Sequence, residues 1–316
     1  LTNVEQELLL FNEALAAGMN EESAINDATE RYNVLKGNPE LYAISTTPLV
    51  VRLLHPYLTH NQKQRSLGDL LYDIILERLG NWSNKDGKEE NIKEFKSYFP
   101  NSYSREVILG KIAASIFNTA NGSITREALY TLLTDEVHNE ENNQLIIAQA
   151  YEFFVHNILH EENNVFIIPS QPLYQCALGI YIANAFGQNQ KPNLKTDHLT
   201  IWREYSFAAT IVRRRNKFED IRMHFQQYIK DLLSAEWARA PIAIIISESG
   251  DRELAKDFII YLEKCEFRPI NYYAGFQDLS SRSYAHCIYL AKDEGFDWFY
   301  ENYLDPKYPY SNTLDN

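Results

Sequence analysis

Hydrophobic residues recur with helical spacing along most of the chain. Leu67, Leu70, Leu71, Ile74 and Ile75 stand at i, i+3, i+4, i+7 and i+8, which places them on one face of a helix. The same periodicity returns in several later segments, so the pattern predicts a mainly α-helical protein.

Residues suited to helix N-caps precede these segments. Ser66 stands before the helix just described, and Thr125 stands at the start of a short helix over 125–134. A helix over 104–118 is expected to begin at Ser104, and another runs through residues 148–155.

One segment has the features of a β-strand. The run VFII (Val165 to Ile168) is rich in β-branched and aromatic residues, follows the turn-forming EENN and stops before Pro169. Together with the helices over 104–118 and 125–134, a third helix and a short strand pair, it predicts a small winged-helix unit.

The segment GQNQKPN (187–193) is the best candidate for a linker. It is followed by aromatic-rich helical segments such as WREYSFAATIV and ELAKDFIIYLEKC, which have similar lengths but no fixed period. Such segments bury their apolar faces by stacking, so we expect a helical repeat-like array, with a compact helical domain as the alternative. The predicted architecture is mainly α: a helical lid over 1–62, a winged-helix-like domain over 63–188 and a sensor array over 194–316.

Composition narrows the class of protein. The chain has 316 residues, enough for two or three domains at roughly 100–200 residues each. Its 30 Lys and Arg against 43 Asp and Glu give a net charge of −13, so nucleic acid is an unlikely partner. Three widely spaced cysteines form no disulfide framework or zinc motif, which indicates a reducing, cytoplasmic location.

No membrane partner is expected, because the apolar run IAIII is far shorter than the ~20 residues that a membrane span needs. No signal peptide is visible at the start of the chain. Because the chain opens with LTNVEQ rather than Met, we expect it to be part of a longer protein, with further motifs upstream.

Several motifs that could carry chemistry are incomplete. The segment ILGKIAAS (108–115) lacks the upstream glycine and the hydroxyl of a phosphate-binding loop and is interpreted as core. His156 and His160 stand at i, i+4 and could share a metal, but exposed helix histidines are the simpler interpretation. Arg282 and His286 have one residue too few between them for the Arg–His pair of helical nucleases.

Two further features have ordinary structural explanations. The run RRRNK (Arg213 to Lys217) could meet phosphate or an acidic partner, or could be a solvated helix end that pairs with Glu219 and Asp220. Cys176 lies in an apolar helical segment, where a cysteine is commonly a small buried hydrophobic residue.

The stretch from Gly37 to Leu58 carries most of the functional argument. Pro48 suits the first position of a helix, where its missing N–H costs nothing, and Thr47 can cap the amides behind it. Pro56 ends or kinks this helix. The start of the helix is therefore a rigid apolar surface that could pack against a core or against a planar ligand such as adenine.

The segment NPELYAISTTPLVVRLL resembles the helical lid of NACHT-type STAND NTPases. SLGDLLYDIILERLGNW resembles the helix that follows the lid in that family, and VFIIPSQPLYQCALGIYIANAF resembles the end of its winged helix. WREYSFAATIV resembles the helix that opens the array behind it. The strength of the resemblance lies in the order of these pieces.

The resemblance implies a nucleotide-gated oligomerisation switch, in prokaryotes commonly used for antiviral defence or signalling. Pro48, with Thr47, would abut the adenine of ATP or ADP bound with Mg. The P-loop domain would precede Leu1, so this chain alone should neither bind nucleotide tightly nor hydrolyse ATP. The family's phosphate-contacting histidine position is occupied by Ile168.

Family analogy also implies a protein ligand on the helical array and self-association on activation. The alternative from another class is a stand-alone α-helical interaction module with no nucleotide role, which suits the 21 Tyr and 16 Phe. A winged-helix nucleic-acid binder is the third possibility, and the net negative charge of the chain argues against it.

Overall fold

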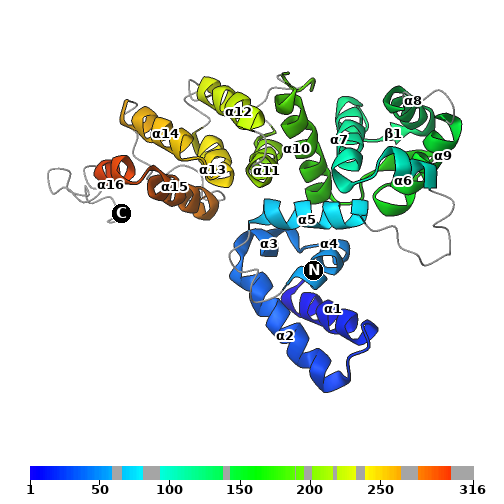
Figure 1. The fold of residues 1–316 in the computed structure, drawn as a ribbon. Helices are drawn as coiled ribbons and strands as arrows, with labels where there is room; N and C mark the ends of the chain where they lie inside the picture. Colours follow the sequence, from blue (N-terminus) through cyan, green and yellow to red (C-terminus); the bar gives the residue numbers. More distant parts are fainter. Residues whose placement is uncertain are drawn as a thin grey trace. The chain divides into compact units, whose positions relative to one another are not determined.

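The computed structural model describes residues 1–58, 66–80, 93–137, 143–188, 190–195, 201–215, 219–232, 239–264 and 277–299. Within these ranges it contains sixteen α-helices, one 3-10 helix and three short strands (Figure 1), so the predicted mainly α fold is confirmed. The chain divides into two compact units, Leu1–Leu178 and Gly179–Asn316. This boundary lies inside one helix, α10 (Gln171–Gly187), and the three-domain division stays a prediction.

The first unit opens with four helices and a 3-10 turn. They are α1 (Asn3–Ala16), α2 (Glu21–Gly37), α3 (Pro39–Ile44), α4 (Pro48–Leu54) and η1 (His55–Tyr57). A capping box starts α1: the Thr2 hydroxyl accepts from the Glu5 N–H (3.3 Å), and the Glu5 carboxylate accepts from the Thr2 N–H (2.7 Å). The core of this bundle is formed by fully buried apolar side chains of α1, α2 and α4, among them Leu10, Ala14, Ala28, Leu35, Val51 and Leu54.

Three of the following helices are predicted to begin at a Ser or Thr N-cap. Ser66 Oγ accepts from the Asp69 N–H (3.2 Å) at the start of α5 (Leu67–Gly80), as predicted. Thr125 likewise caps α8 (Arg126–Glu136). The Ser104 prediction is wrong, because α7 (Ser102–Asn118) is capped by Asn101, whose side chain accepts from the Ser104 N–H at 2.9 Å. The remaining helices of this region are α6 (Lys93–Tyr98) and α9 (Asn143–Asn157).

A small antiparallel sheet completes this region. Its strands are β1 (Ile124–Thr125), β2 (His160–Glu162) and β3 (Val165–Ile167), in the order β1-β3-β2. Asn163 and Asn164 join β2 to β3 with φ angles of 52° and 65°, the left-handed pair that a two-residue type I′ hairpin requires. The strand predicted from VFII is confirmed as β3, whereas the two-residue β1 was too short to leave a sequence pattern.

Arg105 on α7 links its own helix to three others of this unit. Its Nε donates to the Phe99 carbonyl (2.9 Å) and its Nη1 donates to the Leu79 carbonyl at the end of α5 (2.6 Å). The guanidinium lies 5.5 Å from the ring centroids of both Phe95 and Phe153. This buried cation therefore satisfies backbone acceptors and packs on aromatic faces at once.

The second unit is a two-row array of helices (Figure 1). One row consists of α11 (Trp202–Arg214), α13 (Arg239–Ser249) and α15 (Gln277–Ala291), each packed on the next. The other consists of α12 (Glu219–Leu232), α14 (Arg252–Lys264) and α16 (Asp293–Phe299). This packing agrees with the predicted repeat-like array.

Aromatic packing and one glycine determine how closely the first helices of the array pack. The rings of Tyr205 and Tyr228 stack at 5.4 Å, and their hydroxyls are hydrogen-bonded at 3.0 Å. Burial raises the pKa of Tyr205. A Cβ on Gly179 would lie 2.8 Å from the Phe207 Cβ, so only glycine allows α10 to approach α11 this closely. Among the described helices, none is both long enough and apolar enough to cross a membrane.

We predict that Arg105→Met lowers the free energy of unfolding by about 1–3 kcal/mol, because it leaves two buried carbonyls without donors. Denaturant unfolding followed by circular dichroism measures this. Arg126→Met is the matched control: Arg126 also lies near an aromatic ring and pairs with Glu161, but its side chain is exposed, so the unfolding midpoint should change little. Equal losses in both variants would contradict the role given to Arg105.

Candidate functional site

The predicted site residues lie at the N-terminal tip of α4. Pro48 is the first residue of the helix, as predicted, and Thr46, Thr47, Pro48 and Leu49 are all exposed. The predicted capping by Thr47 is wrong: Thr47 occupies the N-cap position with extended backbone angles, but its side chain makes no capping hydrogen bond. We call the exposed residues 46–49 the α4 tip.

The turn that leads into the α4 tip is fixed by α1. Gln6, which is 2% exposed, donates through Nε2 to both the carbonyl and the hydroxyl of Ser45, each at 2.9 Å. The backbone nitrogen of Leu1 donates to the Thr46 carbonyl at 2.8 Å. The exposed tip therefore stands on a backbone whose polar groups are held by the first turns of another helix.

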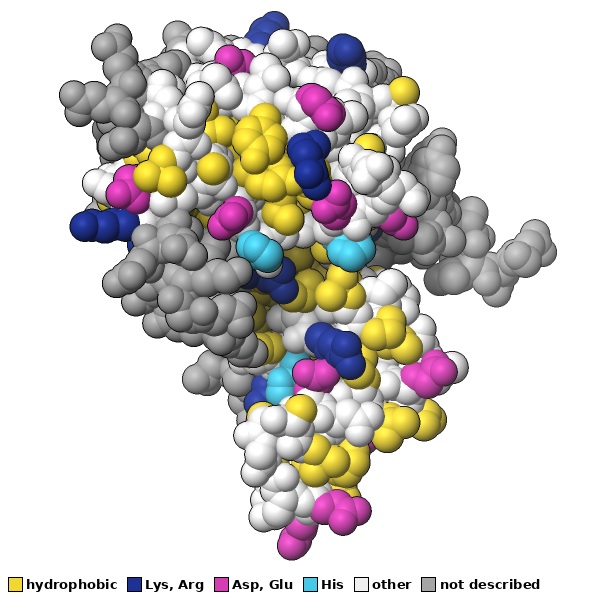
Figure 2. All heavy atoms as spheres, turned by 90° about the vertical axis from the view of Figure 1, so that its right-hand side faces the viewer, with side chains coloured by type: hydrophobic (Ala, Val, Ile, Leu, Met, Phe, Trp, Pro, Cys, Tyr) yellow, Lys and Arg dark blue, Asp and Glu magenta, His cyan; other side chains and the backbone are white. Residues whose placement is uncertain are grey.

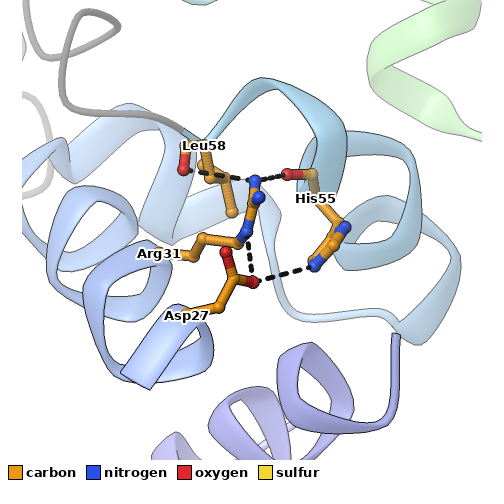
Figure 3. A network of polar contacts seen from close by, with 4 residues as sticks. All are labelled: Asp27, Arg31, His55 and Leu58. Atoms are coloured by element: carbon orange, nitrogen blue, oxygen red, sulfur yellow. Dashed lines mark hydrogen bonds and ion pairs between the residues drawn. The ribbon is translucent and has the colours of Figure 1, made fainter. Parts of the chain in front are cut away.

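The other end of α4 is held by a polar network on α2 (Figure 3). Arg31 Nε lies 2.6 Å from Asp27 Oδ2 on the same helix, at i, i+4 spacing. Arg31 Nη1 donates to the carbonyls of His55 and Leu58, which bracket η1. One arginine thus attaches the 3-10 turn containing Pro56 to α2, and the prediction that Pro56 ends the helix is confirmed.

His55 is the imidazole group of this network. Its Nε2 lies 3.6 Å from Asp27 Oδ2, which is an ion-pair distance but too long for a hydrogen bond. Burial lowers the pKa of His55, and the Arg31 guanidinium lowers it further, while Asp27 and Glu13 act in the opposite direction. The imidazole is therefore neutral at neutral pH.

The α4 tip has the chemistry of a binding surface. Its side chains are two threonines, the pyrrolidine ring of Pro48 and Leu49, none of which titrates. A flat apolar face with hydroxyls beside it can pack against a planar ring and can donate or accept single hydrogen bonds. It offers no general acid or base, so it can bind a ligand but supplies no group for acid–base catalysis.

The histidine pair is not a metal centre of the kind considered. His156 lies in the last turn of α9, but His160 lies on β2, so the two do not share a helix face as predicted. Within the described ranges, no group of three or more His, Cys, Asp or Glu side chains could hold a metal ion. Ile168, which stands where the resemblance expects a phosphate-contacting histidine, follows β3 directly, and its side chain is buried.

The basic run is tied to neighbouring groups. Arg213 Nε donates to the Glu248 carbonyl at 2.9 Å, and the buried Arg215 donates through Nη1 to Asn184 Oδ1 at 2.7 Å. Lys217 lies outside the described residues, as do the side chains of Glu219 and Asp220, so the predicted pairing with them stays a prediction.

The other candidates are part of the core or lie outside the description. Residues 108–115 belong to α7 and include fully buried Leu109 and Ile112, so their interpretation as core is confirmed. Cys176 is likewise fully buried. The Arg282 side chain and Cys265 lie outside the described residues, and the Nδ1 of His286 is hydrogen-bonded to Ser247 Oγ at 2.8 Å.

Sequence reasoning missed the groups that position the tip. Asp27 and Arg31 have the i, i+4 spacing of a helix ion pair and could have been found by that signal. The contact between Gln6 and Ser45 spans 39 positions and has no local signature.

We predict that His55 makes the protein less stable at acidic pH. Because its pKa is lower in the folded state, the unfolded chain binds more protons. This contribution to stability is fully present above about pH 6.5, the ordinary value, and is lost as pH falls through the folded pKa. His55→Gln should therefore show a smaller fall in melting temperature between pH 7.5 and 5.5 than the unmodified chain.

The matched control is His160→Gln, which removes an exposed imidazole on β2 from outside the Asp27–Arg31 network. Proton NMR titration of the His55 ring tests the same point directly. A titration midpoint above the ordinary histidine value would show that Asp27 outweighs burial and Arg31.

The α4 tip stays a predicted ligand site. It is exposed, it is attached at both ends of its helix to other parts of the bundle, and its side chains suit a planar apolar ligand. No family model, curated protein or solved structure matches this chain, so its function rests on its residues and their contacts.

Proposed function

We propose that this chain is the lid, winged-helix and sensor portion of a NACHT-type STAND NTPase, and that it acts as a nucleotide-gated oligomerisation switch. The observation that carries the proposal is the order of the pieces. A helical bundle with the lid-like segment comes first, a helix–strand–helix–helix–strand–strand region follows, and a two-row helical array comes last.

The middle region supports this order through its topology. The succession α7, β1, α8, α9, β2, β3 with the sheet order β1-β3-β2 is that of a winged helix, and the hairpin at Asn163 and Asn164 would form the wing. Residues Ser102–Ile167 are therefore our candidate for the winged-helix domain.

The α4 tip supports the lid assignment. In the proposed arrangement the adenine ring of ATP or ADP packs on Pro48, with Thr47 beside it. The phosphates and Mg are held by a P-loop domain elsewhere in the intact protein. The tip alone gives a nucleotide one apolar face and no charged partner, so this chain binds it weakly and does not hydrolyse it.

Switching follows from a bistable contact between domains that the nucleotide biases. Because Gln6 holds one end of α4 and Arg31 holds the other, the tip moves together with α1 and α2. ADP keeps the lid and winged helix closed, and a protein ligand on the array, with exchange for ATP, releases them for self-association. By analogy, the biological role is defence or signalling in the prokaryotic cytoplasm.

A stand-alone helical interaction module is the second candidate. It is favoured by the exposed aromatic side chains of Tyr289 and Phe296 on the array, which suit a protein-binding surface. This candidate gives the α4 tip no nucleotide role.

We expect the reading frame upstream of Leu1 to encode a GxxxxGK[ST] motif within about 150–250 residues, one domain's length. Sequencing the gene checks this. An upstream frame of that length without the motif would favour the interaction module.

We also predict that Pro48→Ala in the intact protein reduces retention of bound ADP about three- to tenfold, because a ring contact of ~1 kcal/mol is lost. Nucleotide content after desalting, measured by chromatography, reports the change. Pro56→Ala is the matched control, since Pro56 is also an exposed proline but lies at the opposite end of α4. Unchanged retention in Pro48→Ala would remove Pro48 from the site.

A further inference from the structure

The outer face of α1 carries an exposed apolar stripe. Val4, Leu8 and Leu15 are 75%, 55% and 39% exposed, and Phe11 between them is half-buried. Hydrophobic side chains are visible on the surface of this part of the molecule in Figure 2, where the N-terminal helices form the lower portion. We call these four residues the α1 stripe.

The spacing of the α1 stripe is that of a helix–helix seam. Val4, Leu8, Phe11 and Leu15 alternate in steps of four and three, the repeat that keeps apolar side chains facing one partner helix. The buried face of α1, formed by Gln6, Leu10 and Ala14, points to a different side of the helix. The helix therefore has one seam that packs in its own bundle and a second that faces outward.

The neighbouring helix widens this surface. The Thr29 hydroxyl of α2 donates to Glu7 Oε1 at 3.3 Å, so residue 29 lies beside residue 7. α1 packs on α2 in a helical hairpin, so residue 25, one turn before residue 29, is level with residue 11, one turn after residue 7. Ile25 is also exposed. An apolar area shared by two helices is more than the scattered exposure of single residues.

The charges along the α1 stripe point to the chemistry of its partner. Helix α1 contains three glutamates and no lysine or arginine. Glu5 and Glu7 flank the stripe, one on each side. Glu13 lies on the far side of the helix, where it pairs with Arg52 of α4 at 2.8 Å. The edges of the seam are therefore acidic.

Acidic edges disfavour a second copy of this chain and favour a basic partner. Two copies of α1 would bring no cation to the edges of a shared seam to pair with Glu5 and Glu7, and the whole chain already has a net charge of −13. A membrane surface with anionic lipids would be repelled in the same way. Basic residues at the edges of a partner helix would complement Glu5 and Glu7.

We propose that the α1 stripe docks a basic amphipathic α-helix of another protein, whose apolar 3–4 repeat is flanked by Lys or Arg. The apolar seam supplies the attraction and the acidic edges select the partner. This interaction is separate from the proposed nucleotide role, because it uses the outer face of α1 rather than the α4 tip.

The test uses the 316-residue chain and a stapled helical peptide of about three heptads, with Leu at the seam and Lys at the edges. Fluorescence anisotropy should give a dissociation constant of about 1–100 μM, because the contact is small. Leu8→Lys should weaken binding at least about tenfold, since it places a cation in the seam. Met223→Lys on α12, whose side chain is 56% exposed, should bind as the unmodified chain does.

Four results would overturn the proposal. They are equal binding of a peptide with Glu at its edges, unchanged binding by Leu8→Lys, sedimentation of the unmodified chain as a dimer that Leu8→Lys dissolves, and binding to lipid vesicles in place of the peptide. The intact protein should bind the peptide as well as the 316-residue chain does. Loss of that binding would also overturn the proposal, because the seam would then be filled by the protein's own chain. Circular dichroism of Leu8→Lys must match that of the unmodified chain, and Val4→Lys serves as the second variant if it does not.

Discussion

The hydrogen bonds between Gln6 and Ser45 are the constraint on which the proposed site depends. Helix α4 has only seven residues and little intrinsic stability, so its direction is set by what holds its ends. A buried amide that donates to both the carbonyl and the hydroxyl of one residue fixes the turn before Pro48 in position. The exposed Pro48 and Leu49 therefore follow a turn whose position is fixed.

Arginine side chains do the same for other helix ends. The last carbonyls of a helix have no partner within it and need donors from outside. Arg105 donates to Leu79 near the end of α5, Arg78 to Asn157 at the end of α9 and Arg213 to Glu248 near the end of α13. A planar fork with several donors suits this role and adds a packing surface for aromatic rings. These arginines therefore have structural roles, which explains why the basic run at 213–215 is not simply a free anion-binding patch.

The local features of this fold could be predicted and the long-range ones could not. Thr125 and Ser66 cap helices because their hydroxyls reach amides three residues away, and VFII after EENN forms a strand because two asparagines tolerate positive φ. Asn101 was missed because two hydroxyl residues between it and the apolar run gave the same signal. The Gln6–Ser45 contact, the placement of Arg105 and the division of His156 and His160 between α9 and β2 depend on tertiary packing, which one sequence does not encode locally.

The α4 tip and the α1 stripe both depend on the N-terminal part of α1, and this has a thermodynamic consequence. Leu1 and the first turns of α1 hold the Ser45–Thr46 turn on one side, and those turns present Val4 and Leu8 on the other. A helix docked on the stripe would restrict fraying of those turns, and so would a ligand that requires the tip to stay in place. Binding of either the helix or the ligand would then reduce the conformational entropy that the protein loses when the other one binds. Since such coupling is reciprocal, a partner that strengthens nucleotide retention must itself bind more tightly when nucleotide is present.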